Sequence, residues 1–386
     1  MFQNVQDPDL PTLAALTNDD LVRITGDAGA RLLRARYQPG ARAILHVALG
    51  AEQGADEGAI WLFAGDKAAR LAKNLPAARH DPASGALFQV FPNDHRMPLL
   101  LEFVTRSMEL AVPLMGGAAA KAPELLRYRP GLSATFRWQR EDGRVFFVKQ
   151  TPDGAVAQQA LALRHLAEAA KTLPVSFSAV AGVLPDLRLI AYEAAEGVAL
   201  DDRLFGADVA DVTSAIGQVV GALQALWSLR VVPDRVLDRD LLLRRAEQAC
   251  TIITLLDDAA GAMARGLQEG LAGRKVPVRL RPIHGDMKLE HAFLAGPKTT
   301  LIDTESLSLG DPDYDLAKLE ARVRMAEVTG VIANRQAQAA ILEIRKQAGP
   351  HYDWFLACAR LQCAKFFAQR FDPKNIPLMR QVMVPC

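Results

Sequence analysis

The stretch that decides the fold of this chain runs from Arg281 to Leu319 and contains three short motifs. They are His284–His291 (His-Gly-Asp-Met-Lys-Leu-Glu-His), Leu301–Asp303 (Leu-Ile-Asp) and Gly310–Ala317 (Gly-Asp-Pro-Asp-Tyr-Asp-Leu-Ala). A bare His-Gly-Asp triplet has little meaning by itself. The ordered set is more specific, because Asp286 and Asp303 are joined by an apolar hairpin pattern that has little structural need of two carboxylates.

These residue types suit phosphoryl transfer from ATP, a reaction that depends on positioning and charge neutralisation. Asp286, on an irregular turn, can orient an attacking hydroxyl group and accept its proton. Asp303 and the ligand-type residue His291 can hold Mg²⁺, or Mn²⁺, against the phosphates. Lys288 can reach the transferring phosphoryl group as a point charge, and Lys149, farther upstream, can hold the α- and β-phosphates.

A short sequence occurs twice upstream of these motifs. Arg36–Gly40 (Arg-Tyr-Gln-Pro-Gly) recurs as Arg127–Gly131 (Arg-Tyr-Arg-Pro-Gly), 91 positions later. Each copy precedes two runs of β-branched and aromatic residues, which predicts an antiparallel hairpin in each. The second hairpin ends on Lys149, and its equivalent in the first is expected to be Ala64. A chance match of a short turn motif is the alternative interpretation.

The pattern along the chain predicts a β-rich half followed by a helical half. Helical periodicity covers residues 155–170, 212–229, 239–267, 315–328, 336–347 and 352–370, with a strand at 187–192 and a connector at 193–197. This order predicts an α+β fold with two lobes. The predicted domains are a β-containing N-terminal extension (1–120), a nucleotide-binding lobe with a sheet and one helix (121–197), and a helical lobe with the catalytic loop and acceptor pocket (198–386).

Bulk composition narrows the class of partner. The chain has 386 residues and a formal net charge of +1, so a small-molecule partner is favoured over nucleic acid or an anionic membrane. It has no uninterrupted apolar run of about 18 residues, and Met1–Pro8 lacks the pattern of a signal peptide. The four cysteines (Cys250, Cys358, Cys363 and Cys386) follow neither disulfide-framework nor zinc-site spacing. We therefore expect a cytoplasmic protein.

The motifs resemble those of the aminoglycoside phosphotransferase and choline kinase family, whose members have the protein-kinase-like fold. The resemblance covers about residues 120–320 well, the preceding part weakly and the C-terminal helices only in type. It implies a small β-rich lobe, a larger helical lobe and an N-terminal extension that repeats the hairpin of the first lobe. The residues that it implies are Asp286 and Lys288 for catalysis, Asp303 and His291 for the metal, Lys149, Ser133 and Glu193 for the nucleotide, and Asp315 as a brace of the catalytic loop.

Two positions depart from the family pattern. The asparagine five residues after the catalytic aspartate is His291 here, and the helix glutamate that pairs with the strand lysine is Gln159. An imidazole must be neutral to bind a metal, which predicts that activity falls as the pH drops through about 6 to 7. A neutral amide can hydrogen-bond Lys149 but cannot hold it by charge. A pseudokinase that binds nucleotide or ligand without turnover is therefore the alternative function.

Other residues near the motifs have structural interpretations. His284 is interpreted as a structural residue of the loop, and Glu305 as an exposed loop residue. Asp311 and Asp313 flank Pro312 and are interpreted as turn formers. A metal-dependent hydrolase that uses His284 as a ligand, together with the carboxylates and histidine named above, is a further alternative, but it explains neither Lys149 nor the β-rich half.

The predicted function is transfer of the γ-phosphate of ATP to a hydroxyl of a small molecule, such as a sugar, an amino alcohol or an antibiotic. Residues 198–280 contain 11 acidic and 10 basic side chains, and residues 312–386 contain 7 acidic and 11 basic side chains. A polycationic aminoglycoside would need a cluster of carboxylates in its pocket. The balance of charge therefore favours a neutral or anionic acceptor.

Overall fold

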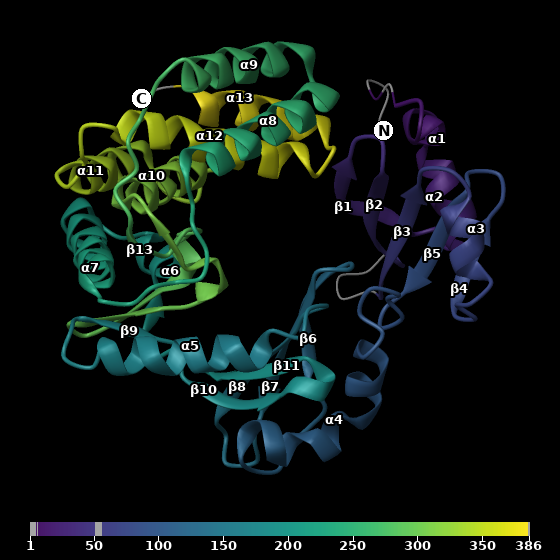
Figure 1. Cartoon of the computed structure of the whole chain (residues 1–386), viewed down its shortest axis with the longest axis horizontal. Helices are drawn as coiled ribbons and strands as arrows, with labels where there is room; N and C mark the ends of the chain where they lie inside the picture. Colours follow the sequence, from purple (N-terminus) through teal and green to yellow (C-terminus); the bar gives the residue numbers. More distant parts are fainter. Residues whose placement is uncertain (1–4, 6, 51–55, 385–386) are drawn as a thin grey trace. The chain divides into compact units, whose positions relative to one another are not determined.

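The computed structural model describes residue 5, residues 7–50 and residues 56–384, and it divides into two compact units. The first unit comprises Met1–Ala160, Val180–Ala194 and Gln369–Asp372, and the second comprises Leu161–Ala179, Ala195–Ala368 and Pro373–Cys386. Most strands belong to the first unit and most helices to the second (Figure 1). The predicted α+β fold is confirmed. Some residues named in the sequence analysis lie outside the described residues, namely Met1–Asn4, Gln6 and Cys386.

The first unit contains two five-stranded sheets with the same topology. The first module has β1 (Arg31–Gln38), β2 (Arg42–Ala48), β3 (Glu57–Phe63), α3 (Lys67–Ala72), β4 (Ala78–Asp81) and β5 (Ala86–Val90), in the order β1-β2-β3-β5-β4. The second module has β6 (Glu124–Arg129), β7 (Ser133–Gln139), β8 (Val145–Gln150), α5 (Val156–Ala169), β10 (Val180–Leu184) and β11 (Leu189–Glu193), in the order β6-β7-β8-β11-β10. The repeat therefore extends from the hairpin to the whole sheet and the helix after its third strand.

The same hydrogen bonds close the repeated turn in both modules. In the first, Asp7 Oδ2 accepts from the hydroxyl of Tyr37 (2.7 Å) and the backbone N–H of Gly40 (2.9 Å). The donors to Asp94 Oδ2 in the second are the hydroxyl of Tyr128 (2.9 Å) and the N–H of Gly131 (2.6 Å). A chance match of a turn motif would not reproduce a carboxylate from outside the motif, so the repeat is a structural one.

The strand register corrects the expected counterpart of Lys149. Lys149 pairs with Thr135 across the β7–β8 ladder. Ile44, which lies 91 positions before Thr135, pairs with Trp61 across the β2–β3 ladder. The counterpart is therefore the fully buried Trp61 and not Ala64. The prediction was wrong because the connection between the two strands is longer in the first module.

The turn between β6 and β7 packs on the sheet face of the first module that carries Trp61. A Cβ atom added to Gly131 would lie 2.6 Å from Trp61 Cη2 and 3.1 Å from Arg96 Cδ. The guanidinium of Arg36 donates a hydrogen bond to the carbonyl oxygen of Pro130. Lys149 lies on one face of the sheet in the second module. The corresponding face of the sheet in the first module is covered by the β6–β7 turn.

We expect Gly131→Ala to destabilise the first unit more than Gly40→Ala. Both glycines have left-handed φ angles, +65° and +66°, so both alanines carry a strain of about 1 kcal/mol. Only the Cβ at position 131 collides with a packed ring, because the nearest atom to a Cβ at position 40 is Asp9 Oδ2 at 3.4 Å. Overpacking should add about 1–3 kcal/mol. Urea unfolding measures both variants, and equal losses would show that the turn does not pack against Trp61.

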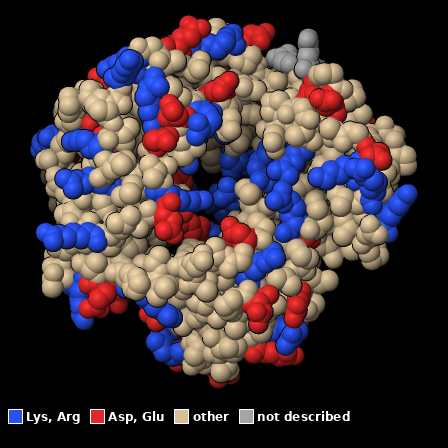
Figure 2. Space-filling view, viewed as in Figure 1, with Lys and Arg blue, Asp and Glu red and all other residues tan. Residues whose placement is uncertain are grey.

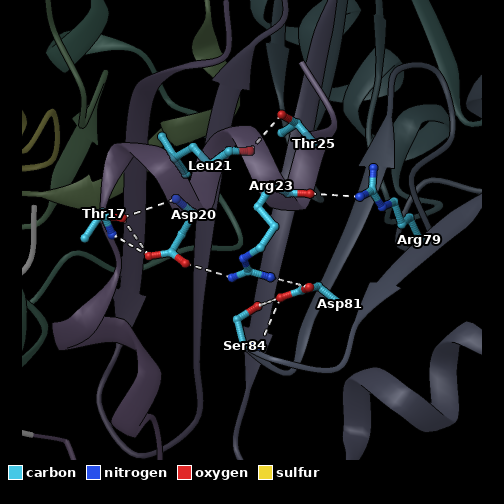
Figure 3. Close-up of polar contacts among 8 residues, drawn as sticks. All are labelled: Thr17, Asp20, Leu21, Arg23, Thr25, Arg79, Asp81 and Ser84. Carbon is cyan, nitrogen blue, oxygen red and sulfur yellow. Dashed lines mark hydrogen bonds and ion pairs between the residues drawn. The ribbon is translucent and has the colours of Figure 1, made fainter. Parts of the chain in front are cut away.

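Helices α1 (Pro11–Ala15) and α2 (Asn18–Thr25) precede the first sheet. Thr17 and Asp20 form a capping box at the start of α2. Arg23 near its end donates to Asp20 (2.8 Å) and also pairs with Asp81 of β4, while Arg79 donates to the carbonyl oxygen of Arg23 (2.8 Å) (Figure 3). These contacts fasten α2 to the β4–β5 hairpin.

Helix α4 (Leu100–Met115) forms the apolar core of the second module with its sheet. The ring of Phe103 lies 4.9 Å from that of Phe136 and 5.9 Å from that of Trp138. A Cβ on Gly182 of β10 would lie 2.4 Å from the carbonyl oxygen of Leu114, so the helix backbone approaches the sheet closely. The short 3₁₀ turn Pro185–Leu187 joins β10 to β11.

Eight α-helices of the described residues lie wholly in the second unit, which also contains residues 161–169 of α5. They are α6 (Leu200–Leu204), α7 (Val209–Ser228), α8 (Arg239–Leu256), α9 (Asp258–Ala272), α10 (Pro312–Val328), α11 (Asn334–Arg345), α12 (Tyr352–Ala368) and α13 (Ile376–Met383). The single helix predicted at 239–267 is two helices, so that prediction was wrong. Asp257 ends α8 and caps α9 by accepting from the N–H of Ala260 (2.7 Å), and it also pairs with Arg380 (2.6 Å).

Short strands of the second unit hold the sequence motifs. β13 (Arg281–Ile283) pairs with β16 (Ser308–Gly310), and β12 (Val198–Ala199), β14 (Ala292–Ala295), β15 (Lys298–Leu301) and β9 (Val175–Phe177) form a second sheet in that order. The 3₁₀ turns are Leu289–His291, Thr304–Ser306 and Pro373–Asn375. The His-Gly-Asp loop therefore connects β13 to β14, Asp303 follows β15, and α10 follows β16.

Helix α7 alone, among the residues that the structure describes, is long and apolar enough to cross a membrane. Half of its most apolar 18-residue stretch is buried inside the protein. The core helix of a soluble protein meets the same criterion. Since Val219, Leu223 and Leu226 are buried, the helix has the burial of a core element.

Candidate active site

One buried carboxylate holds the His-Gly-Asp loop in place. Asp315 of α10 accepts hydrogen bonds from the backbone N–H groups of His284 (2.8 Å) and Gly285 (2.9 Å) and from the indole N–H of Trp227 (3.1 Å). Gly285 has a φ of +77°, and a Cβ there would lie 2.4 Å from the carbonyl oxygen of Ser306, so only glycine fits the turn. These contacts are those of the brace that the resemblance implied for Asp315.

The candidate catalytic residue Asp286 lies between two lysines. Its Oδ1 is 2.8 Å from the ammonium nitrogen of Lys318, and its Oδ2 is 3.0 Å from that of Lys288. Lys318 is buried, with only 5% of its side chain exposed, whereas 34% of the Asp286 side chain is exposed. The carboxylate therefore has a permanent buried partner on one side and a partner on its own loop on the other.

Lys318 is a site residue that sequence reasoning missed. It follows Asp315 by three residues in α10, so both side chains point from one face of the helix toward the loop. Lys318 lies in the segment Tyr314–Ala321, every residue of which is buried, and the sequence alone does not display this burial. A buried lysine needs a charged partner, and that partner was the catalytic candidate itself.

The two lysines keep Asp286 ionised. Burial acts to raise the pKa of this carboxyl, but the charges of Lys318 and then Lys288 outweigh it and hold the pKa well below its usual range. Burial acts to lower the pKa of Lys318, and the charge of Asp286 reverses this, so the pKa of the lysine is raised. Such a carboxylate is a weak base but a well-placed hydrogen-bond acceptor.

His291 and Asp303 meet beside this pair. His291 Nε2 lies 3.3 Å from Asp303 Oδ2 and 3.3 Å from the ammonium nitrogen of Lys288. Asp303 adopts a left-handed backbone with a φ of +56°, a conformation that aspartate tolerates better than most residues. Adjacent ligands of an octahedral Mg²⁺ are about 3 Å apart, given metal–oxygen distances of about 2.1 Å, so the two atoms fit one divalent cation.

The pKa of His291 is far lower than an ordinary imidazole would have. Burial, followed by the charge of Lys288, lowers it to about 3, although Asp303 acts in the opposite direction. The ring is therefore neutral at any ordinary pH, and its Nδ1 is buried without a hydrogen-bond partner in the described part of the chain. The loss of activity at pH 6 to 7 predicted from an unperturbed histidine is not expected of this one.

The predicted nucleotide residues belong to the first unit. Ser133 pairs with Arg129 across the β6–β7 turn, and Thr135 pairs with both Arg127 and Lys149. Because directly paired residues point to the same face of a sheet, Lys149 and Arg127 share one face. Glu193 is exposed at the end of β11, next to the connector that leads to the second unit.

Gln159 makes a contact that the family pattern did not suggest. Its amide nitrogen donates a hydrogen bond of 2.9 Å to the hydroxyl of Tyr192 on β11. The glutamine therefore links α5 to the strand that ends at Glu193. This contact gives the amide a structural role in the second module.

Three other residues of the motif region, His284, Asp311 and Asp313, make hydrogen bonds within the second unit. His284 Nε2 hydrogen-bonds the carbonyl oxygen of Ile302 (2.9 Å). Asp311 caps α10 and accepts two hydrogen bonds of 2.9 Å from Arg279, and Asp313 accepts one from the N–H of Gly349 (2.9 Å). Glu305, expected to be exposed, is half-buried in a 3₁₀ turn. In the described ranges no three His, Cys, Asp or Glu side chains are grouped so as to hold a metal ion.

The fold and the loop define a small-molecule phosphotransferase, and comparison with known proteins assigns the family. The model of the phosphotransferase enzyme family named APH matches residues 124–353, more than half of the chain. The chain belongs to this family. The match begins at β6, so the first module precedes the family region. No curated protein matches the sequence.

The chain is similar to solved structures of antibiotic and choline kinases. Aminoglycoside phosphotransferase APH(4)-Ia, solved with AMP-PNP and hygromycin B, is 14% identical, with a TM-score of 0.50 over 72% of this chain and 95% of that one. Aminoglycoside-3'-phosphotransferase of type VIII is 20% identical, with a TM-score of 0.49 over 72% and 100%. Choline kinase LicA from Streptococcus pneumoniae is 13% identical, with a TM-score of 0.46 over 70% and 90%.

Proposed function

We propose that this phosphotransferase transfers the γ-phosphoryl group of ATP to a hydroxyl group of a small molecule. The observation that carries the proposal is the carboxylate of Asp286, which Lys288 and Lys318 keep ionised on a loop braced by Asp315. Phosphoryl transfer needs an oriented acceptor hydroxyl more than a strong base, and an ionised carboxylate held in this way can provide it. The AMP-PNP and hygromycin B of the APH(4)-Ia structure support a nucleotide donor and a hydroxylated acceptor.

In the proposed reaction Asp286 aligns the acceptor hydroxyl. Its oxygen forms a bond to the γ-phosphorus while the bond from that phosphorus to the bridging oxygen breaks, and ADP leaves with the electron pair. The hydroxyl proton passes to Asp286. Lys288 exchanges its contact with Asp286 for the transferring phosphoryl oxygens, which frees Oδ2 for the acceptor, whereas the buried Lys318 stays with Oδ1.

Lys149, Ser133 and Glu193 are the proposed nucleotide residues, with Lys149 on the α- and β-phosphates. Asp303 and His291 are the proposed ligands of the metal. Mg²⁺ or Mn²⁺, when bound, neutralises charge on the β- and γ-phosphates. In this proposal each predicted domain has its own role: residues 121–197 bind the nucleotide, and residues 198–386 carry the catalytic residues and bind the acceptor. The absence of an acidic excess in residues 198–280 and 312–386 supports a neutral or anionic acceptor for this cytoplasmic enzyme.

A screen by ADP release tests the function. Sugars, amino alcohols, nucleosides and hydroxylated antibiotics are supplied with ATP and Mg²⁺, and calorimetric titration of ATP runs in parallel. We expect acceptor-dependent ADP release with at least one class. Tight ATP binding without turnover on every class would support the pseudokinase alternative and overturn the proposed transfer.

The identity of the metal ligand at position 291 predicts a metal preference. Imidazole suits later transition metals, whereas Mg²⁺ prefers oxygen, so the wild type should turn over with Mn²⁺ at least as fast as with Mg²⁺. His291→Asn replaces the nitrogen ligand by an amide oxygen and should shift the preference toward Mg²⁺. Steady-state rates at matched free metal concentrations measure this. Identical metal profiles of the two proteins would remove His291 from the metal site.

A further inference from the structure

The β1–β2 and β6–β7 turns have the same internal closure but different surroundings. Asp7 and Asp94, which close them, each also accept a hydrogen bond from the N–H two residues later, of 3.0 Å and 2.8 Å. Within the described residues, and apart from adjoining ones, a Cβ on Gly40 would meet a single atom within 4 Å, whereas one on Gly131 would meet the ring of Trp61. The β6–β7 turn is therefore held twice, by its own carboxylate and by the first module.

Three adjacent strands of the first module support the β6–β7 turn. Arg36 of β1 donates a hydrogen bond to the carbonyl oxygen of Pro130. The ring of His46 on β2 meets the ring of Tyr128 edge to face, with centroids 5.5 Å apart and planes at 89°. Trp61 of β3 lies against the glycine of the turn. The support is thus a surface of the sheet and not a single side chain.

This surface corresponds to the nucleotide face of the second module. Arg36 and Trp61 both pair with Ile44, in the β1–β2 and β2–β3 ladders, so they lie on one face. Trp61 stands at the position that Lys149 has in the second module. A fully buried indole has no charge with which to hold a phosphate group, and the face is occupied by the neighbouring turn. The first module therefore supports the β6–β7 turn with the surface that faces the nucleotide in the second.

We propose that the first module positions the β6–β7 turn for the nucleotide, with Arg36, His46 and Trp61 as positioning residues. The inference rests on the proposed function, because the turn leads into Ser133 and the strand after it pairs with the strand of Lys149. A turn that is already held in one conformation loses less conformational entropy when a ligand binds to it. The first module should therefore strengthen ATP binding through the turn.

Calorimetric titration of the full chain with ATP and Mg²⁺ tests the contact from β1. Basic side chains gather over β1 and β2 (Figure 2), so the control must remove the same charge. Arg36→Met removes the donor to the carbonyl oxygen of Pro130, and Arg31→Met removes a charge from an exposed position of the same strand. We expect ATP binding by Arg36→Met to be about 3- to 10-fold weaker than by Arg31→Met. Melting temperatures verify that both variants fold.

Uncharged substitutions test the contact from β3. Gly131→Ala places a methyl group against Trp61 and should displace the turn, so it should bind ATP about 3- to 10-fold more weakly than Gly40→Ala, which has the same backbone strain. Trp61→Phe removes the part of the ring that contains Cη2 and makes room for this methyl group. Trp61→Phe/Gly131→Ala should therefore bind ATP more tightly than Gly131→Ala alone. An alanine that collided with the nucleotide itself would not be rescued in this way.

Steady-state kinetics separate positioning from general loss of structure. Arg36→Met should raise KM for ATP and leave kcat close to that of the wild type, because the turn does not hold the loop of Asp286. Equal ATP affinities of Arg36→Met and Arg31→Met, or no rescue of Gly131→Ala by Trp61→Phe, would overturn the inference. Tighter ATP binding by Arg36→Met would also overturn it, since the first module would then hold the turn away from the nucleotide.

Failure of the proposed function gives a different result. A wild type that does not bind ATP would overturn the proposed function and the positioning role together. A wild type that binds ATP equally well with and without the Arg36 contact would overturn the positioning role alone. Because affinity is measured without turnover, the test also applies to a protein that binds ATP and does not transfer its phosphoryl group.

Discussion

Replacing Asp286 by asparagine is expected to lower kcat by about 10²–10⁴ while ATP affinity stays close to that of the wild type. The amide can no longer accept the hydroxyl proton, and it also loses its ion pairs with Lys288 and Lys318. Steady-state kinetics with the best acceptor and calorimetric titration of ATP measure the two quantities. Near-normal turnover would remove Asp286 from its proposed role.

Asp286→Asn should also be less stable than the wild type. A second substitution in that variant should restore stability without restoring activity. Breaking a fully buried ion pair costs about 3–5 kcal/mol; because 34% of the Asp286 side chain is exposed, we expect a loss of about 1–3 kcal/mol. Lys318→Met in the same protein removes the unpaired buried charge with an apolar side chain of similar length. The double variant should regain much of the stability and none of the activity. If it is no more stable than Asp286→Asn, Lys318 is not the buried partner.

Asp315→Ala is expected to have the largest effect on stability, a loss of at least about 4 kcal/mol. It leaves three donors without their acceptor, the buried N–H groups of His284 and Gly285 and the half-buried indole N–H of Trp227, and each buried donor costs about 1–3 kcal/mol when unsatisfied. Urea unfolding measures the loss. Activity should fall with it, because the loop that carries Asp286 is no longer held.

Trp227→Phe provides the matched control for the brace. It removes one donor and leaves Asp315 with its two backbone partners, so we expect a loss of about 1 kcal/mol and nearly normal turnover. If Asp315→Ala does not fold, Asp315→Asn replaces it in the test. The asparagine keeps the shape of the side chain and one acceptor oxygen, so its loss of stability should lie between those of Asp315→Ala and Trp227→Phe. A loss for Asp315→Ala no greater than that for Trp227→Phe would contradict the bracing role.

Much of the site could be predicted from residues that are close in the sequence. Asp286, Lys288 and His291 lie close together in the sequence. Asp303 is brought to His291 because the strands β14 and β15 between them form a tight hairpin. The fold class followed from the order of strand and helix patterns. Local spacing is sufficient for such features because short hairpins and helices fix which side chains meet.

Other features depend on register and packing, which a single sequence does not display. The counterpart of Lys149 shifted from Ala64 to Trp61 because the connections between paired strands differ in length, and a ladder is aligned by hydrogen bonds and not by residue count. The helix predicted through Asp257 is broken because that side chain caps the next helix and pairs with a distant arginine. Apolar periodicity continues across such a break and conceals it.

The sequence by itself therefore determined the fold class, the family motifs and the two carboxylates at the centre of the candidate site. Only the tertiary structure decided that the repeat is a complete second sheet and that Lys318 holds Asp286. The physical reason is that the distant neighbours of a strand or of a buried charge are set by packing after the local elements have formed. The free energy of the buried charge depends on those neighbours.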